Sequence, residues 1–358
     1  MFSFTRHRTG HPATLFVVRM ELRFGPERPS SLPESGNYEP PATPVRFEIK
    51  PYTTQKIEGR ISIENREVAM PVSMSVAKFL PSGDRETNLN NIPALDPQNP
   101  VWVVVHGRID SESSDPMREL AQSLTSNNVQ VVTLDWSQGA KDNFPELIGL
   151  QGSDWIEAVG KWTSSQLKAA GFTAEKINLV GHSWGSYVSY EIAKNMGNDV
   201  NVLVALDPAK DTILSGYDES QVDFAHHSQK SFALHSSFYG DETRALTADY
   251  AIQVVDDAAA RPSIEHGYAV TAFSSLLQDA RNPYSVAAWF APQQWMGNAE
   301  PTIESRDGWD SVLHVNTWQS QKSDGSAWWK AMPQTLEYTD TNTGNHAVDQ
   351  IIGNDTIS

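Results

Sequence analysis

Short apolar runs alternate with helix-like stretches through the middle of the chain. Five runs are apolar at nearly every position, which is typical of parallel strands buried on both faces: residues 101–105, 129–134, 177–180, 202–206 and 250–255. Between them, apolar positions recur at helical spacing over residues 116–125, 153–170, 186–194 and 268–277. This alternation predicts an α/β fold with a mostly parallel central sheet and helices on both faces.

The chain before residue 100 has a different pattern. Apolar and polar residues alternate over 45–49, 61–63 and 72–76, which predicts antiparallel strands at the N-terminal edge of the sheet. Residues 25–44 contain six prolines, too many for a regular hydrogen-bonded ladder. We therefore predict a disordered tail and proline-rich linker over 1–44 and an α/β domain over 45–300, followed by a C-terminal extension over 301–358.

The C-terminal extension contains strand-like runs and several tryptophans, namely Trp309, Trp318, Trp328 and Trp329. They indicate either a small extra sheet or an aromatic cluster that touches a membrane. Core packing is the commoner use of tryptophan, so we favour the first interpretation.

A five-residue motif, Gly181-His182-Ser183-Trp184-Gly185, lies between the predicted strand at 177–180 and the predicted helix at 186–194. In this context Gly-x-Ser-x-Gly predicts a sharp strand-to-helix turn that exposes a nucleophilic serine. Gly181 and Gly185 would let the two backbones approach without a Cβ in the way. The motif makes Ser183 the candidate nucleophile.

A serine nucleophile needs a histidine base and an acid that orients it, which follow in the order serine, acid, histidine in this type of site. Asp207 directly ends the next predicted strand and is the favoured acid; Asp241, Asp249 and Asp256 are alternatives. His266, between a loop and a helix after the strand at 250–255, is the favoured base. His226, His227 and His235 remain open as bases, His106 and His182 are expected to support the site, and His314 and His346 are expected to be structural or exposed.

The reaction intermediate also needs two backbone N–H groups as an oxyanion hole. The residue after the serine, Trp184, supplies one. The strand at 101–105 runs into His106-Gly107, which nominates the amide of Arg108 as the other.

Four segments together resemble the pancreatic-lipase-like family of α/β-hydrolases: residues 105–107, 134–140, 181–185 and 206–209. The resemblance implies the α/β-hydrolase fold, a triad of Ser183, Asp207 and His266, and an oxyanion hole at Arg108 and Trp184. It implies a serine acyl-ester hydrolase acting on lipids, as a lipase, phospholipase A1 or galactolipase. A small-ester carboxylesterase and a non-catalytic lipid-binding relative are the alternatives.

The chain departs from the family in two places. Only residues 256–265 separate the last parallel strand from His266, where the family's vertebrate lipases carry a long lid closed by a disulfide. This resembles short-lid bacterial lipases and phospholipases A1, and it favours more polar lipids than triglyceride. Arg108 replaces a usually apolar residue and could meet an anionic headgroup or have no role.

Composition limits the partners. The 358-residue chain has a net charge of −17, which argues against a nucleic-acid partner. It contains no cysteine. No apolar run is long enough to span a membrane. We expect a lipid or other acyl-ester substrate, peripheral contact with lipid aggregates, and no metal or cofactor for catalysis.

The last residues, 352–358, resemble the opening of a Gly-Gly-x-Gly-x-Asp calcium repeat. If the repeat continues in a longer parent chain, calcium binding and export through a C-terminal signal rather than a Sec signal peptide are expected. The alternative location is the cytoplasm.

Overall fold

Six parallel strands form the centre of the molecule. They are β4 (Val101–Val105), β5 (Gln130–Asp135), β6 (Ile177–His182), β7 (Val200–Leu206), β8 (Ser228–His235) and β9 (Tyr250–Val255). The computed structural model describes residues 45–47, 56–63, 69–126, 129–141, 152–210, 216–255, 266–279, 311–319, 331–340 and 351–352. Five of the strands were expected, whereas β8 was not, because it opens with the polar residues Ser228-Gln229-Lys230-Ser231.

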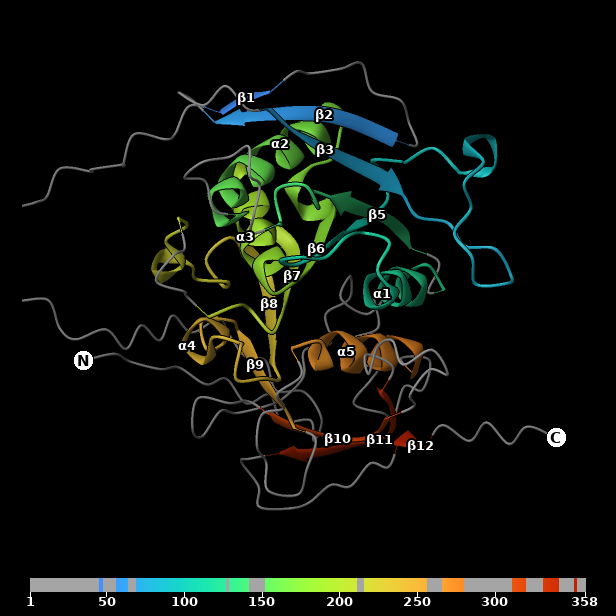
Figure 1. Ribbon diagram of the computed structural model, residues 1–358, viewed down its shortest axis with the longest axis vertical. Coiled ribbons are helices and arrows are strands. Elements are labelled where there is room, and N and C mark those ends of the chain that lie inside the picture. Colours follow the sequence, from blue (N-terminus) through green and yellow to red (C-terminus); the bar gives the residue numbers. More distant parts are fainter. Residues whose placement is uncertain are drawn as a thin grey trace, which may run out of the picture.

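Further strands extend both edges of this parallel centre. β1 (Val45–Phe47), β2 (Lys56–Ile63) and β3 (Ala69–Val76) pair antiparallel on one side, which confirms the predicted edge strands. On the other side, β10 (Ser311–Gln319) pairs parallel with β9, and β11 (Ala331–Asp340) and β12 (Ile351–Ile352) follow antiparallel. Within the described residues, the strands form one sheet in the order β1-β2-β3-β5-β4-β6-β7-β8-β9-β10-β11-β12 (Figure 1).

Strands from the predicted C-terminal extension therefore continue the same sheet rather than forming a separate one. The N-terminal tail, residues 1–44, lies outside the described residues, and so do three of the four tryptophans named above. Trp318 lies in β10.

Helices cover both faces of the sheet, as predicted. In Figure 1, α2 (Ile156–Ala169) and α3 (Trp184–Met196) lie on one side, and α1 (Asp115–Thr125) and α5 (Tyr268–Asp279) lie on the other. α4 (Glu242–Ala245) is a single turn, and the 3₁₀ turns are η1 (Leu89–Asn91), η2 (Gly152–Trp155), η3 (Ala174–Lys176) and η4 (Glu219–Gln221).

The side chains of β4 show how the two helical layers share the sheet. Successive side chains of a strand point to opposite faces. Val103 and Val105 accordingly join the core under α2 and α3, whereas Trp102 and Val104 join the core under α1 and α5. Since all of these side chains are buried, the central strand has an apolar residue at every position.

The contact between α2 and α3 depends on a glycine. A Cβ at Gly160 would lie 2.4 Å from Cβ of Glu191 on α3, so the two helices could not keep their separation. Replacing Gly160 by alanine should cost about 1–3 kcal/mol of unfolding free energy, as overpacking does.

Urea unfolding of the Gly160→Ala variant measures this cost. The control is Ala169→Ser, which adds one heavy atom at an exposed position of the same helix. Equal stability of the two variants would contradict the described packing of α2 on α3.

Candidate active site

The candidate catalytic residues meet at one edge of the sheet because neighbouring parallel strands end in register. Val105 pairs with Gly181, His182 with Leu206, and Leu206 with Leu234. The loops after β4, β6, β7 and β8 therefore emerge side by side. In parallel sheets this carboxyl edge is where ligands bind.

The turn after β6 has the geometry of a nucleophile elbow. Ser183 has φ 56° and ψ −124°, an unfavourable conformation for a residue with a side chain. A Cβ at Gly181 would lie 2.1 Å from the Gly185 carbonyl oxygen, and a Cβ at Gly185 would lie 2.4 Å from the Val105 oxygen. Only glycine fits at both positions, so the flanking glycines of the motif are explained by the close approach of β6, α3 and β4.

Asp207 and His266 form a hydrogen-bonded pair. Asp207 follows β7 and is fully buried, and its Oδ2 lies 2.5 Å from Nδ1 of His266. Burial alone would raise the pKa of Asp207, but the hydrogen bond and charge of His266 outweigh burial and hold it below its usual range. An ionised carboxylate can only accept, so Nδ1 of His266 carries the proton and Nε2 is left as the base.

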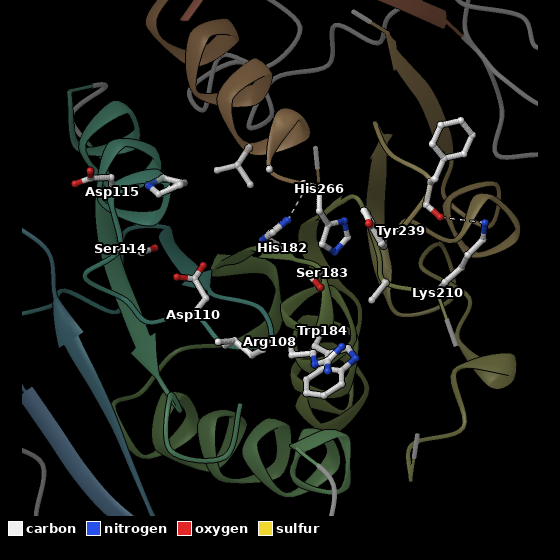
Figure 2. A pocket seen from close by; sticks show the side chains of 16 residues that line it. Arg108, Asp110, Ser114, Asp115, His182, Ser183, Trp184, Lys210, Tyr239 and His266 are labelled. Carbon is white, nitrogen blue, oxygen red and sulfur yellow. Dashed lines mark hydrogen bonds between the residues drawn. The ribbon is translucent and has the colours of Figure 1, made fainter. Parts of the chain in front are cut away.

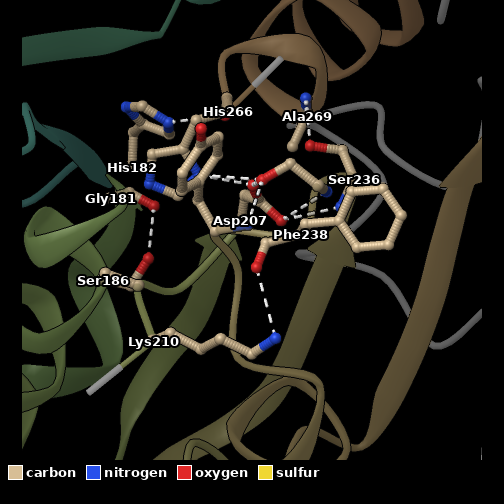
Figure 3. A network of polar contacts seen from close by, with 12 residues as sticks. Gly181, His182, Ser186, Asp207, Lys210, Ser236, Phe238, His266 and Ala269 are labelled. Carbon is tan, nitrogen blue, oxygen red and sulfur yellow. Dashed lines mark hydrogen bonds and ion pairs between the residues drawn. The ribbon is translucent and has the colours of Figure 1, made fainter. Parts of the chain in front are cut away.

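Two serines that the sequence analysis missed complete the surroundings of Asp207 (Figure 3). The amides of Ser236 and Ser237 donate to Oδ1 at 2.7 and 3.1 Å, and the Ser237 hydroxyl donates to Oδ2 at 2.5 Å. With His266 these donors match the roughly four acceptor positions of a carboxylate. The Ser237 hydroxyl also lies 3.2 Å from Nδ1 of His266, so it touches both members of the pair.

Ser183 and His266 line the same cavity, of about 610 Å³ (Figure 2). This volume is within the usual range for small-molecule sites. The structure thus pairs Asp207 with His266 and places His266 and Ser183 in one cavity. A serine hydroxyl and an oriented imidazole in one cavity are the groups that acyl transfer needs.

Both candidate oxyanion donors border the serine. Trp184 is the first residue of α3, and the first N–H groups of a helix have no partner within it. The loop after β4 comes so close that a Cβ at Gly107 would lie 2.7 Å from Cβ of Ser183. The main chain at Gly107, directly before Arg108, therefore lies against the nucleophile.

His106 and Trp136 shape this loop, which agrees with the supporting role expected for His106. Nδ1 of His106 donates to the Gly107 oxygen at 3.0 Å, and its Nε2 accepts from the Trp136 amide at 3.1 Å. The Trp136 indole donates to the His106 oxygen at 3.0 Å and stacks on the His106 ring. The ring therefore holds the loop from both sides.

The Arg108 guanidinium lies over the Trp184 ring, with its carbon 5.4 Å from the ring centroid. This is a cation–π arrangement. Both residues line the cavity, so the positive charge that the sequence analysis noted is held beside the nucleophile.

The other acids and bases considered in the sequence have different roles. Asp241 caps α4, and Asp249 accepts from the backbone and hydroxyl of Ser231. The rings of His226 and His227 contact each other, and His227 packs on Tyr190. His235 is buried at the end of β8, whereas Asp256 and His346 lie outside the described residues and His314 lies in β10.

Backbone strain is concentrated at this edge of the sheet. Among the described residues, the non-glycine residues with positive φ are Ile109, Ser183 and Asp207. All three lie in the loops that carry the site. Strained backbone of this kind clusters at functional sites, where surrounding contacts hold it in place.

No group of three or more metal-ligating side chains occurs among the residues that the structure describes. The candidate calcium segment, apart from Ile352, is outside them. Nor does the described part contain a helix that is both long and apolar enough to cross a bilayer.

Comparison with known proteins identifies the family. The model of the alpha/beta hydrolase family matches residues 102–343. The chain belongs to the alpha/beta hydrolase family. The sheet and its helical layers are accordingly those of the α/β-hydrolase fold, as predicted.

Individual relatives of this alpha/beta hydrolase are distant. Pancreatic lipase-related protein 2 of Homo sapiens is 25% identical over 111 residues, which cover 30% of this chain and 23% of the relative. The same protein of Sus scrofa is 25% identical over 146 residues, covering 38% and 30%. The chain thus spans about a quarter of the length of these curated relatives. Among solved structures, Est1E from Butyrivibrio proteoclasticus is similar with a TM-score of 0.39 and 12% identity, covering 63% of this chain and 96% of that one.

The Ser237 hydroxyl should matter for catalysis. Replacing Ser237 by alanine removes one donor from the buried Asp207 carboxylate and one contact to His266, so kcat should fall about 10-fold. KM should change little, because Ser237 does not line the cavity. Steady-state kinetics on a nitrophenyl ester measures both.

Ser236→Ala is the matched control. The Ser236 hydroxyl accepts from the Ala269 amide and makes no contact with Asp207, so the loss in kcat should be smaller. An equal loss in both variants would mean that the Ser237 hydroxyl has no particular role in orienting the pair.

Proposed function

We propose that this chain is a serine acyl-ester hydrolase that acts on lipids through an acyl-enzyme intermediate. One observation carries the proposal: the buried Asp207 carboxylate holds Nδ1 of His266, and both His266 and Ser183 open into one cavity. Family membership supports a hydrolase, and the similarity to lipases supports an ester substrate.

In the proposed reaction, Nε2 of His266 accepts the Ser183 proton as Oγ attacks the ester carbonyl. The Arg108 and Trp184 amides stabilise the resulting oxyanion, and Asp207 stabilises the imidazolium. The imidazolium then protonates the leaving alcohol. Water, activated by the same histidine, releases the acid from Ser183.

The apolar character of the cavity supports a lipid substrate. Ile109, Phe238 and Tyr239 line it and have exposed fractions of 69, 57 and 62%. These three are among the six large apolar side chains that are exposed in the described part of the chain. An apolar rim around a catalytic cavity fits contact with a lipid aggregate, where the rim leaves water.

Within lipids, we favour a polar glycerolipid, cleaved as by a phospholipase A1 or galactolipase. In Figure 2, Asp110, Ser114 and Asp115 line one side of the cavity, and Tyr239 and Lys210 line the other. A triglyceride has no headgroup that would use these polar and charged side chains. Hydroxyls or a phosphate would find hydrogen-bond partners there.

Replacing Ser183 by alanine should lower ester hydrolysis by at least about 10⁴-fold, because the nucleophile is lost while the fold remains. The matched control is Ser189→Ala, a buried serine on α3, the helix that follows Ser183, and it does not line the cavity. The measurement is turnover of nitrophenyl esters from acetate to palmitate, followed by triglyceride, phospholipid and galactolipid.

Each outcome of this panel separates the candidates. Hydrolysis of long-chain and lipid esters supports the proposal, and activity confined to acetate and butyrate would favour a small-ester carboxylesterase. No turnover by the unmodified protein would favour a non-catalytic lipid-binding relative. Near-normal turnover by Ser183→Ala would refute the assigned nucleophile.

The strained Ile109 offers a test of aggregate contact. Its φ is 54°, which a β-branched residue adopts at a cost, whereas asparagine tolerates such values. Ile109→Asn should therefore keep or slightly raise stability, yet lower hydrolysis of emulsified or micellar lipid several-fold more than hydrolysis of dissolved nitrophenyl acetate. Leu89→Asn, at an exposed leucine outside the cavity, is the control. Equal losses on dissolved and aggregated substrates would argue against contact between the apolar rim and the lipid aggregate.

Export through a C-terminal signal and calcium binding stay predictions from the sequence, because residues 353–358 lie outside the described part of the chain.

A further inference from the structure

His182 lies between the nucleophile elbow and the base. It ends β6 directly before Ser183 and is 8% exposed. Its Nε2 lies 2.9 Å from the backbone oxygen of His266, and the two rings are 4.8 Å apart between centroids. The residue before the serine therefore contacts the residue that would deprotonate it (Figures 2 and 3).

The direction of this hydrogen bond is fixed by chemistry. A carbonyl oxygen only accepts, so Nε2 of His182 carries a proton and donates. Burial, followed by the nearby charge of His266, lowers the pKa of His182 to about 4, although Asp110 and Asp207 oppose the shift. The ring is therefore a neutral donor at ordinary pH. It adds no positive charge beside a histidine that must itself become positive during the reaction.

The bond to His182 complements the contacts at the other end of His266. Asp207 and Ser237 hold the imidazole at Nδ1, whereas His182 holds the main chain from which the side chain starts. A ring fixed at Nδ1 but free at its backbone could still tilt Nε2 away from Ser183. Holding both ends leaves one orientation, and an error of about 1 Å in such geometry costs about 100-fold in rate.

We propose that His182 is a positioning residue: its Nε2–H holds the His266 backbone so that the imidazole faces Ser183. This role rests on the proposed serine-hydrolase function. It is distinct from catalysis proper, because His182 donates to the protein and exchanges no proton with substrate.

Three substitutions separate positioning from packing. His182→Leu removes the donor but keeps apolar bulk. His182→Gln places an amide N–H near the position of Nε2, whereas His182→Asn is too short to reach the His266 oxygen. His227→Leu, a half-buried histidine against Tyr190 and outside the cavity, controls for losing a histidine elsewhere.

The experiment measures kcat and KM for nitrophenyl butyrate together with the thermal midpoint of each variant. The concentration of active sites is titrated with a fluorophosphonate, so that kcat refers only to folded enzyme. We expect kcat per titrated site to fall about 10–100-fold in His182→Leu and His182→Asn, a larger change than in KM, although His182 also lines the cavity. His182→Gln should recover most of the loss.

A packing role would give another result: lower thermal midpoints and fewer active sites, but wild-type kcat per site in the leucine and asparagine variants. That result would overturn the proposal, as would a glutamine variant no better than asparagine. If His182→Leu does not fold, the comparison of glutamine with asparagine decides alone. An unmodified protein that neither turns over ester nor reacts with the fluorophosphonate would instead refute the proposed function, and this role with it.

Discussion

One buried carboxylate, that of Asp207, connects the segments on which the candidate site depends. Asp207 follows β7. Its carboxylate accepts hydrogen bonds from two amides and a hydroxyl in the loop after β8, and it pairs with the histidine that precedes α5. A charge taken out of water is costly unless it is fully hydrogen-bonded. The donors around Asp207 meet that requirement, so the ionised state and the arrangement of the three segments stabilise each other.

In the described part of the chain, strained backbone lies at the same edge of the sheet. Ser183 and Asp207 both have positive φ at the ends of neighbouring parallel strands. Hydrogen bonds from the Ser183 amide to Leu206 and from the Asp207 amide to Leu234 hold each turn against the next strand. The glycines at 181 and 185 remove the side chains that would prevent this. Rigid strands thus fix the positions of loop residues that would not adopt these conformations alone.

Much of this arrangement could be predicted from the sequence because the signals are local. Continuous apolar runs located β4 and β9 to the residue, and the Gly-x-Ser-x-Gly motif between a strand and a helix located the turn at Ser183. Asp207 was found from its place at a strand end. The strand β8 was missed because its first half is polar, and without β8 nothing marked the two serines that follow it. A Ser-Ser pair has no pattern of its own, so only the fold shows that it surrounds Asp207.

The roles of His106 and His182 depend on contacts between segments distant in sequence. His182 meets His266 across 84 positions, and His106 meets Trp136 across 30. Because both histidines stand next to a motif in the sequence, a supporting role could be predicted for them. Their hydrogen-bond partners, and which atom donates, could be identified only from the structure. The Arg108 side chain likewise lies over the Trp184 ring, a contact that the spacing of residues in the sequence does not indicate.

In the proposed function, the Asp207–His266 pair activates Ser183. The most direct measurement is the rate and position of covalent labelling by a fluorophosphonate, mapped by peptide mass spectrometry in the unmodified protein and in Asp207→Asn. We expect a single label on Ser183, formed at least about 100-fold more slowly in the variant, because the asparagine amide no longer orients the imidazole as the carboxylate does. A label on another residue, or equal rates in the two proteins, would contradict it.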